Sequence, residues 1–110
     1  FNGTTGEFTA PISGKYKVTS RIRYASNTWT TANEASLVIS KGGSTYSVFG
    51  DTRAWATLSV EMSVVGGDAI SLLAGEKIKI QAISTRTGGA TSLSTSGTVN
   101  FLNIERVGNY

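Results

Sequence analysis

The sequence predicts an all-β fold, an antiparallel sandwich, and three observations carry this prediction. Apolar and polar residues alternate with a period of two along several segments, and no window shows helical periodicity. Glycine-marked turns recur about every eight to twelve residues, as in known sandwiches. Ser and Thr account for 29 residues and Gly for 13, which suits strands and turns. We expect a single domain over residues 1–110, because this length leaves no room for a second.

The first long strand is the clearest element. A short strand ending near Thr9 leads into a corner marked by Pro11 and Gly14, and an alternating segment follows. One side of this segment is expected in the core and the other in water. The inward side comprises Tyr16, Val18, Ser20, Ile22 and Tyr24, and the outward side comprises Lys15, Lys17, Thr19, Arg21 and Arg23. The basic outward side suits either an acidic polysaccharide or a solvated face that resists aggregation.

The later elements are predicted from turns and alternation. In chain order they are a loop over 25–34, a hairpin of strands 36–40 and 45–49, a strand over 56–65, a turn at 66–68, an extended piece over 69–73 and a strand over 77–82. The Ser-, Thr- and Gly-rich segment 84–97 is expected to be a long exposed loop. The final strand, 99–107, has apolar residues on both faces, so we expect it at a sheet centre or a subunit contact.

The chain contains no Cys and no His, which excludes most common reaction chemistry. A Cys nucleophile, a Ser-His-Asp triad, a His or Cys zinc site and a disulfide are all ruled out. Glu61 and Glu105 could hydrolyse a glycoside only if they lay close together, and nothing in the sequence brings them together. We therefore expect no enzyme, no catalytic residue, no metal and no cofactor.

Charge and hydropathy limit the partners. The net charge is +3, but the basic residues are scattered rather than clustered, so we expect no nucleic-acid binding. No stretch approaches the ~18 apolar residues of a membrane span, so no membrane insertion is expected. The chain starts at Phe1 rather than Met, and we expect it to be the carboxyl-terminal domain of a longer chain. The lack of cysteine suits a microbial or viral surface protein.

Three places resemble the complement one-q and tumour necrosis factor-like jelly roll. The first is the pattern Phe8-Thr9-Ala10-Pro11-x-x-Gly14-x-Tyr16, which matches that family's Phe-Thr-Ala-Pro-x-x-Gly-x-Tyr. The second is the segment from Leu72 to Ile80, similar to the family's Leu-x-x-Gly-Asp-x-Val turn before a long strand. The third is the terminal strand, which departs from the Phe-Ser-Gly-Phe-type ending of animal members. That ending looks more like the version in bacteriophage fibre and bacterial surface proteins.

The resemblance implies a jelly roll of about ten strands that assembles as a homotrimer. It also implies a noncatalytic receptor-binding and trimerisation domain of a phage tail fibre, tailspike or other virion protein that attaches to host-surface glycan. The location would be the virion tail or fibre, or the cell surface. The alternatives are a purely structural trimerisation clamp, a bacterial surface or spore-coat trimer, and a carbohydrate-binding module of a larger polysaccharide-degrading enzyme. Some family members bind calcium near the threefold axis, where Asp51 or Asp68 could contribute, although turn formation is the ordinary role of such aspartates.

Two sets of candidate site residues follow. Trp29 lies in a polar segment where its indole could stack on a sugar, and the alternative is that it covers a core edge or a subunit seam. Trp55 and Arg53 could grip an anionic sugar, and the alternative is that Trp55 packs in the core or at an interface. The candidate glycan-binding residues are Asn27, Trp29, Arg53, Trp55 and Arg86. The candidate trimer-interface residues are Tyr24, Phe101, Leu102, Ile104 and Tyr110.

Overall fold

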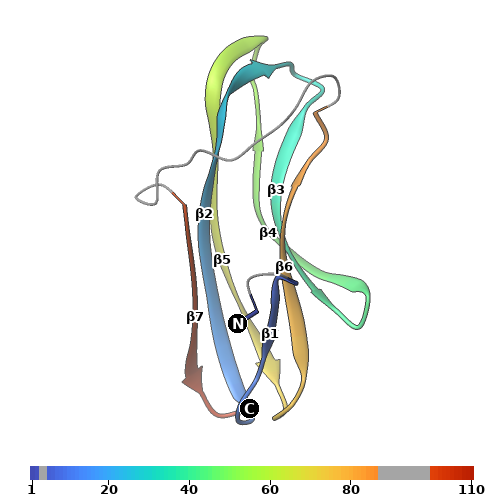
Figure 1. Ribbon diagram of the computed structural model, residues 1–110, viewed down its shortest axis with the longest axis vertical. Helices are drawn as coiled ribbons and strands as arrows, with labels where there is room; N and C mark the ends of the chain where they lie inside the picture. The colour runs from blue at the N-terminus through green and yellow to red at the C-terminus, as the bar shows by residue number, and fades with distance from the viewer. Residues whose placement is uncertain (3–4, 87–99) are drawn as a thin grey trace.

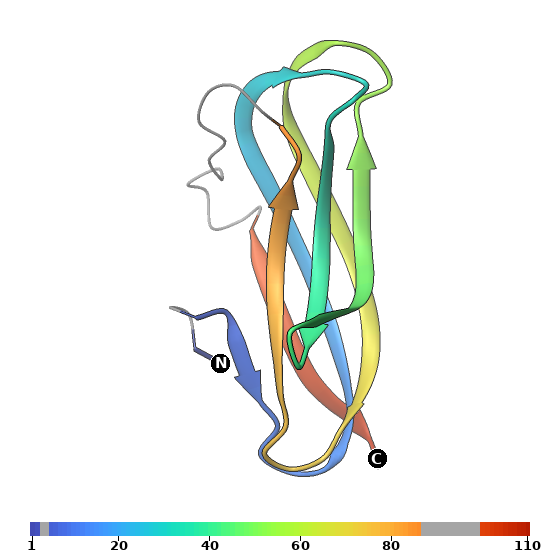
Figure 2. The ribbon, with the colours of Figure 1, turned by 90° about the vertical axis from the view of Figure 1, so that its right-hand side faces the viewer.

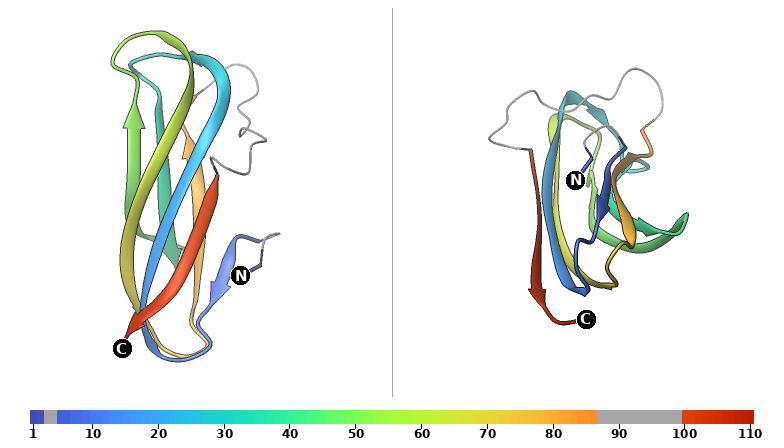
Figure 3. Two further views of the ribbon diagram at one scale, coloured as in Figure 1. Left: turned by 90° about the vertical axis from the view of Figure 1, so that its left-hand side faces the viewer. Right: turned by 60° about the horizontal axis from the view of Figure 1, so that its bottom comes forward.

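A computed structural model describes residues 1–2, 5–86 and 100–110, whose strands form two antiparallel sheets packed face to face (Figure 1). The strands are β1 (Glu7–Thr9), β2 (Gly14–Trp29), β3 (Glu34–Lys41), β4 (Ser44–Arg53), β5 (Leu58–Leu72), β6 (Lys77–Ser84) and β7 (Phe101–Gly108). One sheet has the order β1-β6-β3-β4 (Figure 2), and the other has the order β5-β2-β7 (Figure 3, left). Except at the β3–β4 hairpin, each connection between successive strands joins the two sheets, which is jelly-roll wiring.

The all-β jelly-roll prediction is therefore confirmed, although the strands are fewer and longer than the expected ten. The described residues form seven strands, of which β2 has 16 residues and β5 has 15. These two strands pair along most of their length and form the backbone of their sheet. The molecule is correspondingly elongated, with principal extents of 44 × 26 × 22 Å.

The opening sequence pattern has a structural role at the corner between β1 and β2. The Tyr16 hydroxyl donates a hydrogen bond to the Ile12 carbonyl at 2.6 Å, and this bond fixes the corner. The Phe8 ring meets the Tyr16 ring edge-on with centroids 5.3 Å apart. Since β1 and β2 belong to different sheets, this aromatic pair joins the two layers at the end where the chain enters the sandwich.

The predicted alternation of β2 is confirmed as far as Tyr24. Every inward residue from Tyr16 to Tyr24 is buried, while the outward residues are exposed or half-buried. Ser20 is the one polar member, and its hydroxyl donates to the Phe101 carbonyl at 2.8 Å, which satisfies the buried group. The largest fully buried side chains of the core are Trp29, Leu37, Ile39, Leu72, Ile78, Val18 and Val64.

The predicted loop over 25–34 is wrong for its first half, because β2 continues to Trp29. The pairing register shifts between Tyr24 and Asn27: Tyr24 lies opposite Met62, and Asn27 lies opposite Val60. One extra residue on β2 at this bulge reverses which side of the strand faces inward. Inward positions are therefore even-numbered before the bulge and odd-numbered after it, which directs Trp29 into the core.

The predicted turn at 66–68 is also wrong, because β5 runs through these residues without a break. Gly66 serves a close approach between strands: a Cβ at this position would lie 1.8 Å from the Phe49 carbonyl oxygen of β4. Only a residue without a side chain allows β5 to pass this close to β4. The contact closes one long side of the sandwich, where β4 and β5 are the edge strands of the two sheets.

The other predicted turns are confirmed. Gly42 and Gly43 form the β3–β4 hairpin, both with positive φ, and this explains the glycine pair. The turn around Gly75 precedes β6, where Ile78 is buried and the neighbouring lysines are exposed. The predicted loop 84–97 lies outside the described residues except for 84–86, of which Ser84 ends β6.

The final strand does not occupy a sheet centre, contrary to one of the two expectations. Among the described residues, β7 pairs only with β2 and lies at the edge of its sheet. Leu102 and Ile104 face inward and pack against the core, whereas Phe101 and Val107 face outward and are about half exposed. Val99 lies outside the described residues.

Candidate functional site

The candidate glycan-binding residues gather at one end of the sandwich. The β2–β3 and β4–β5 connections and the end of β6 all lie there, as the upper part of Figure 1 shows. Arg86 follows β6 and reaches β2, where its Nε donates to the Thr28 carbonyl at 2.8 Å and its Nη2 donates to Asn27 Oδ1 at 2.6 Å. Asn27 and Arg86 therefore come together, and their contact ties one sheet to the other.

The prediction that Trp29 stacks on a sugar is wrong. Its exposed fraction is 0%, and its ring lies 5.5 Å from the Tyr24 ring, centroid to centroid. Its Nε1–H has no hydrogen-bond partner among the described residues. An indole in this position cannot stack on a sugar, so Trp29 belongs to the core and not to a glycan site.

Tyr24 likewise lies in the core rather than at a subunit contact. Its side chain is buried in the core with its ring against that of Trp29, and burial raises the pKa of its phenol. The proposal that Tyr24 meets a neighbouring chain is therefore wrong. The alternation of the sequence places it correctly inward, and that signal argues for the core.

Trp55 is exposed, so it does not pack in the core of its own chain, which was one of the alternatives to sugar binding. It lies in the β4–β5 connection with 83% of its surface accessible. Arg53, two residues earlier, forms an ion pair with Glu34, and both side chains remain partly accessible. An accessible indole beside charged and hydroxyl groups can stack on the apolar face of a sugar while its neighbours bind hydroxyl groups. Four of the five candidates thus share this end, and Trp55 is the accessible aromatic among them.

The outer face of the β5–β2–β7 sheet carries a row of three side chains. Arg21 lies opposite Val65 of β5 and opposite Phe101 of β7. Its guanidinium carbon is 5.6 Å from the centroid of the Phe101 ring, and Val65 is 65% exposed. No described segment covers this face, which is turned toward the viewer in Figure 3, left. Such an apolar and cationic row is suited to contact with another protein surface.

The other interface candidates divide between the two sides of β7. Leu102 and Ile104 point to the core of their own chain, so they do not lie on this outer face. Tyr110 is 64% exposed beyond the end of β7. Of the five candidates, Phe101 and Tyr110 are exposed, Leu102 and Ile104 are half-buried beside a hollow, and Tyr24 is buried.

The acidic residues do not form a reactive pair or a cation cage in the described part of the chain. Glu61 lies on the outer face beyond the Tyr24–Met62 pair, and Glu105 lies opposite Lys17, about 23 Å further along the strand at ~3.3 Å per residue. Glu61 instead approaches Arg23 at 3.9 Å. Asp68 accepts hydrogen bonds from the Ser47 hydroxyl and from the Ala69 amide, which are local roles. No group of three acidic residues with metal-binding geometry occurs among the described residues.

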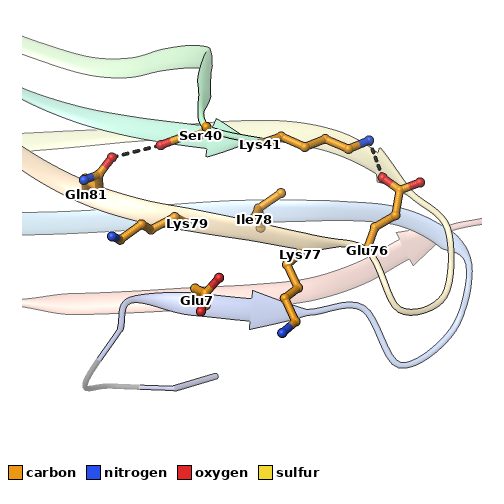
Figure 4. Close-up of a pocket in the computed structure, with 10 residues that line it drawn as sticks. Glu7, Ser40, Lys41, Glu76, Lys77, Ile78, Lys79 and Gln81 are labelled. Atoms are coloured by element: carbon orange, nitrogen blue, oxygen red, sulfur yellow. Dashed lines mark hydrogen bonds and ion pairs between the residues drawn. The ribbon is translucent and has the colours of Figure 1, made fainter.

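A basin on the outer face of the β1–β6–β3–β4 sheet was missed by the sequence reasoning (Figure 4). Its volume is about 600 Å³, and β1, β3, β6 and the β3–β4 hairpin supply its lining. Lys41 donates to the Glu76 carboxylate at one end of the basin. This hydrogen bond raises the pKa of the Lys41 amine and lowers the pKa of the Glu76 carboxyl. Lys77, Lys79 and Gln81 point outward, as the alternation of a strand requires, but no pattern in the sequence indicates the residues of β1, β3 and the hairpin around them.

No helix capable of crossing a membrane occurs within the described ranges. No protein-family model matches the chain, and no curated protein matches it.

Solved structures do match the fold. The structure of Eiger TNF from S. frugiperda superposes with a TM-score of 0.68 and 16% identity, over 100% of this chain and 69% of that one. The globular domain of zebrafish complement 1qA protein superposes with a TM-score of 0.55 and 20% identity, over 94% of this chain and 68% of that one. The fold implied by the opening motif is therefore confirmed: this chain is a jelly roll of the kind found in tumour necrosis factor and complement C1q globular domains.

Proposed function

We propose that this chain is a noncatalytic homotrimeric attachment domain that binds surface glycan. The setting that suits it best is a tail fibre, tailspike or other virion protein, or another protein displayed outside a cell. The trimer is proposed because Val65, Arg21 and Phe101 form a row on the outer face of the β5–β2–β7 sheet, with the two apolar side chains exposed. The similarity to tumour necrosis factor and complement C1q domains supports the same assignment at the level of the fold.

Assembly would bury these side chains, which a single chain leaves exposed to water. Val65 and Phe101 expose apolar surface on a flat sheet face, and burying such surface contributes about 25 cal/mol per Å². Arg21 is already positioned over the Phe101 ring, so its charge remains stabilised when water is excluded. A domain of 110 residues also has a modest core, to which a subunit interface adds buried area.

The glycan-binding part of the proposal rests on the loop end. Trp55 offers its ring to solvent, and two residues earlier the guanidinium of Arg53, paired with Glu34, remains partly accessible for hydrogen bonds to a ligand. Three copies of a weak site on one trimer would act together on a repetitive polysaccharide, which raises the overall affinity without any new contact.

The solution mass and glycan binding test the two parts separately. A trimer that binds glycan through Trp55 supports both parts. A stable trimer that binds no glycan would instead favour a structural clamp. A monomer that binds glycan would favour a carbohydrate-binding module of a larger enzyme.

A further inference from the structure

The basin on the β1–β6–β3–β4 sheet has an unbalanced set of charges. It contains three lysines and two glutamates, and Lys41 and Glu76 neutralise each other. Lys77 and Lys79 have no ion pair with a carboxylate within the described ranges. Glu7 lies opposite Lys79 in the strand register but makes no ion pair with it. The basin therefore has a surplus of positive charge.

Protection of a sheet edge does not account for these lysines. Exposed lysines on an edge strand often serve to block pairing with another chain. β6, however, lies between β1 and β3: Lys79 has register partners in both strands, and Lys77 has one in β1. Lys77 and Lys79 project from its outer face, while Ile78 between them is buried and anchors the strand. The two lysines are therefore carried by a strand that the buried Ile78 side chain holds in place.

The neutral groups of the basin suit the hydroxyl groups of a sugar. The Ser40 hydroxyl donates to Gln81 Oε1 at 2.9 Å, which leaves the amide N–H groups of Gln81 to donate to a ligand. The Glu7 carboxylate lines the same basin and can accept hydrogen bonds from hydroxyl groups. Figure 4 shows Glu7 on β1 and Ser40 on β3, on opposite sides of β6, which carries Gln81.

The surface continues beyond this basin. A second hollow of about 470 Å³ shares Lys41 with the first and adds Lys15 and Tyr46. The Tyr46 ring is half exposed and offers a flat apolar surface. Lys15 and Tyr46 are therefore further groups that a ligand extending past Lys41 would meet.

We propose that this basin binds an acidic polysaccharide, with Lys77 and Lys79 on its carboxylate or sulfate groups and with Gln81 and Glu7 on its hydroxyl groups. The assignment rests on the glycan-binding part of the proposed function, names its ligand class and places it at a second location. Charge-assisted hydrogen bonds of this kind are roughly twice as strong as neutral ones, so the acid group would select the ligand.

Calorimetric titration with heparin, polygalacturonate and neutral dextran tests the proposal, at about 150 mM salt to screen diffuse attraction. We expect heparin, polygalacturonate or both to bind and dextran not to bind. Lys77→Gln and Lys79→Gln should each weaken binding roughly tenfold or more, because each loses a charged contact. Lys79→Arg should retain most of the affinity, because it retains the charge.

Lys17→Gln is the matched control, since it removes the same charge from the other sheet, and its solution mass is measured as well because Lys17 lies on the same face as Arg21. An equal loss of affinity in this variant would overturn the proposal, because net charge alone would then explain the binding. Failure of both acidic polymers to bind would overturn it as well. Loss of binding in Trp55→Ala with unchanged Lys77→Gln and Lys79→Gln would overturn the basin but leave the loop-end site intact. The solution mass tests the trimer independently of all these outcomes.

Discussion

The aromatic rings of Tyr24 and Trp29 lie 5.5 Å apart inside the sandwich, on either side of a bulge in β2. Strict alternation would direct residues of even and odd number to opposite faces of the strand. The extra residue between Tyr24 and Asn27 cancels this difference, so both rings enter the core. A tryptophan that looks like a surface residue in the sequence thereby becomes one of the largest core side chains.

Trp29 should therefore affect stability rather than recognition. Trp29→Ala leaves a large cavity and should lower the free energy of unfolding by about 3–5 kcal/mol. Trp29→Phe should cost much less, because it also removes an N–H that has no partner among the described residues. Denaturant unfolding of the two variants measures the difference. Equal losses would contradict the burial of the ring, because the ring that Phe retains would then contribute nothing to packing.

Gly66 should tolerate no side chain. A methyl group there would collide with the Phe49 carbonyl, and a backbone atom cannot move aside cheaply. Gly66→Ala should cost about 3 kcal/mol or more. Gly108→Ala in β7 is the matched control, since its Cβ would meet nothing closer than 4.0 Å, and it should change stability little. Similar unfolding midpoints for the two variants would contradict the close approach of β5 to β4.

These two residues show how far the sequence could predict the fold. Period-two alternation and glycine-marked turns predicted the sandwich, the inward side of β2 and the hairpin at Gly42. Each of these features is determined by residues that are close together in the sequence. The bulge after Tyr24 and the role of Gly66 depend on β5 and β4, which are distant in sequence. In the sequence, the pair Gly42-Gly43 at a turn cannot be distinguished from the pair Gly66-Gly67, where Gly66 lies against the backbone of another strand. The partner strand must be known first.

Trp55 should be dispensable for folding and required for glycan binding at the loop end. Its ring is 83% exposed, so Trp55→Ala should leave the thermal midpoint almost unchanged. Binding to a glycan array should fall strongly in the same variant. Ile83→Ala, which truncates another exposed apolar side chain, serves as the control. A Trp55→Ala protein that retains full array binding would remove Trp55 from the site.

The outer face of the β5–β2–β7 sheet should control assembly. A lysine in place of Val65 or Phe101 would bury an unpaired charge in the proposed interface, so Val65→Lys and Phe101→Lys should both dissociate the trimer. Val48→Lys makes the same change at an exposed position of the other sheet and should leave the assembly intact. Light scattering reports the mass of each variant. Dissociation by Val48→Lys and not by the other two would place the interface on the opposite sheet.

The Lys41–Glu76 ion pair should stabilise the fold only at pH values between the titration of the Glu76 carboxyl and that of the Lys41 amine. The pKa of Glu76 is lowered, so its contribution is present above the unfolded value of about 4.5 and is lost as the pH falls through the folded value. The pKa of Lys41 is raised, so its contribution is present below about 10.5 and is lost as the pH rises through the folded value. Lys41→Gln should flatten the stability profile at both limits, as measured by unfolding at a series of pH values. A profile identical to that of the unchanged chain would show that the pair is not formed in solution.

The candidate site was predictable only in part. Trp55, Arg53, Asn27 and Arg86 were selected by residue type, and the jelly-roll wiring places them at one end. Leu102 and Ile104 were selected because the final strand is apolar on both faces, and the sequence could not say which face meets the core. The lysine basin escaped notice because its walls come from three strands and a hairpin that only tertiary structure brings together.

The trimer is the central claim, and the solution mass of the unchanged chain tests it most directly. Gel filtration with light scattering at low micromolar concentration should give about three times the 11.5 kDa chain mass, with and without a calcium chelator. A threefold mass in both conditions is the predicted result. A mass of one chain would contradict the account, because the row formed by Val65, Arg21 and Phe101 would then remain exposed to water.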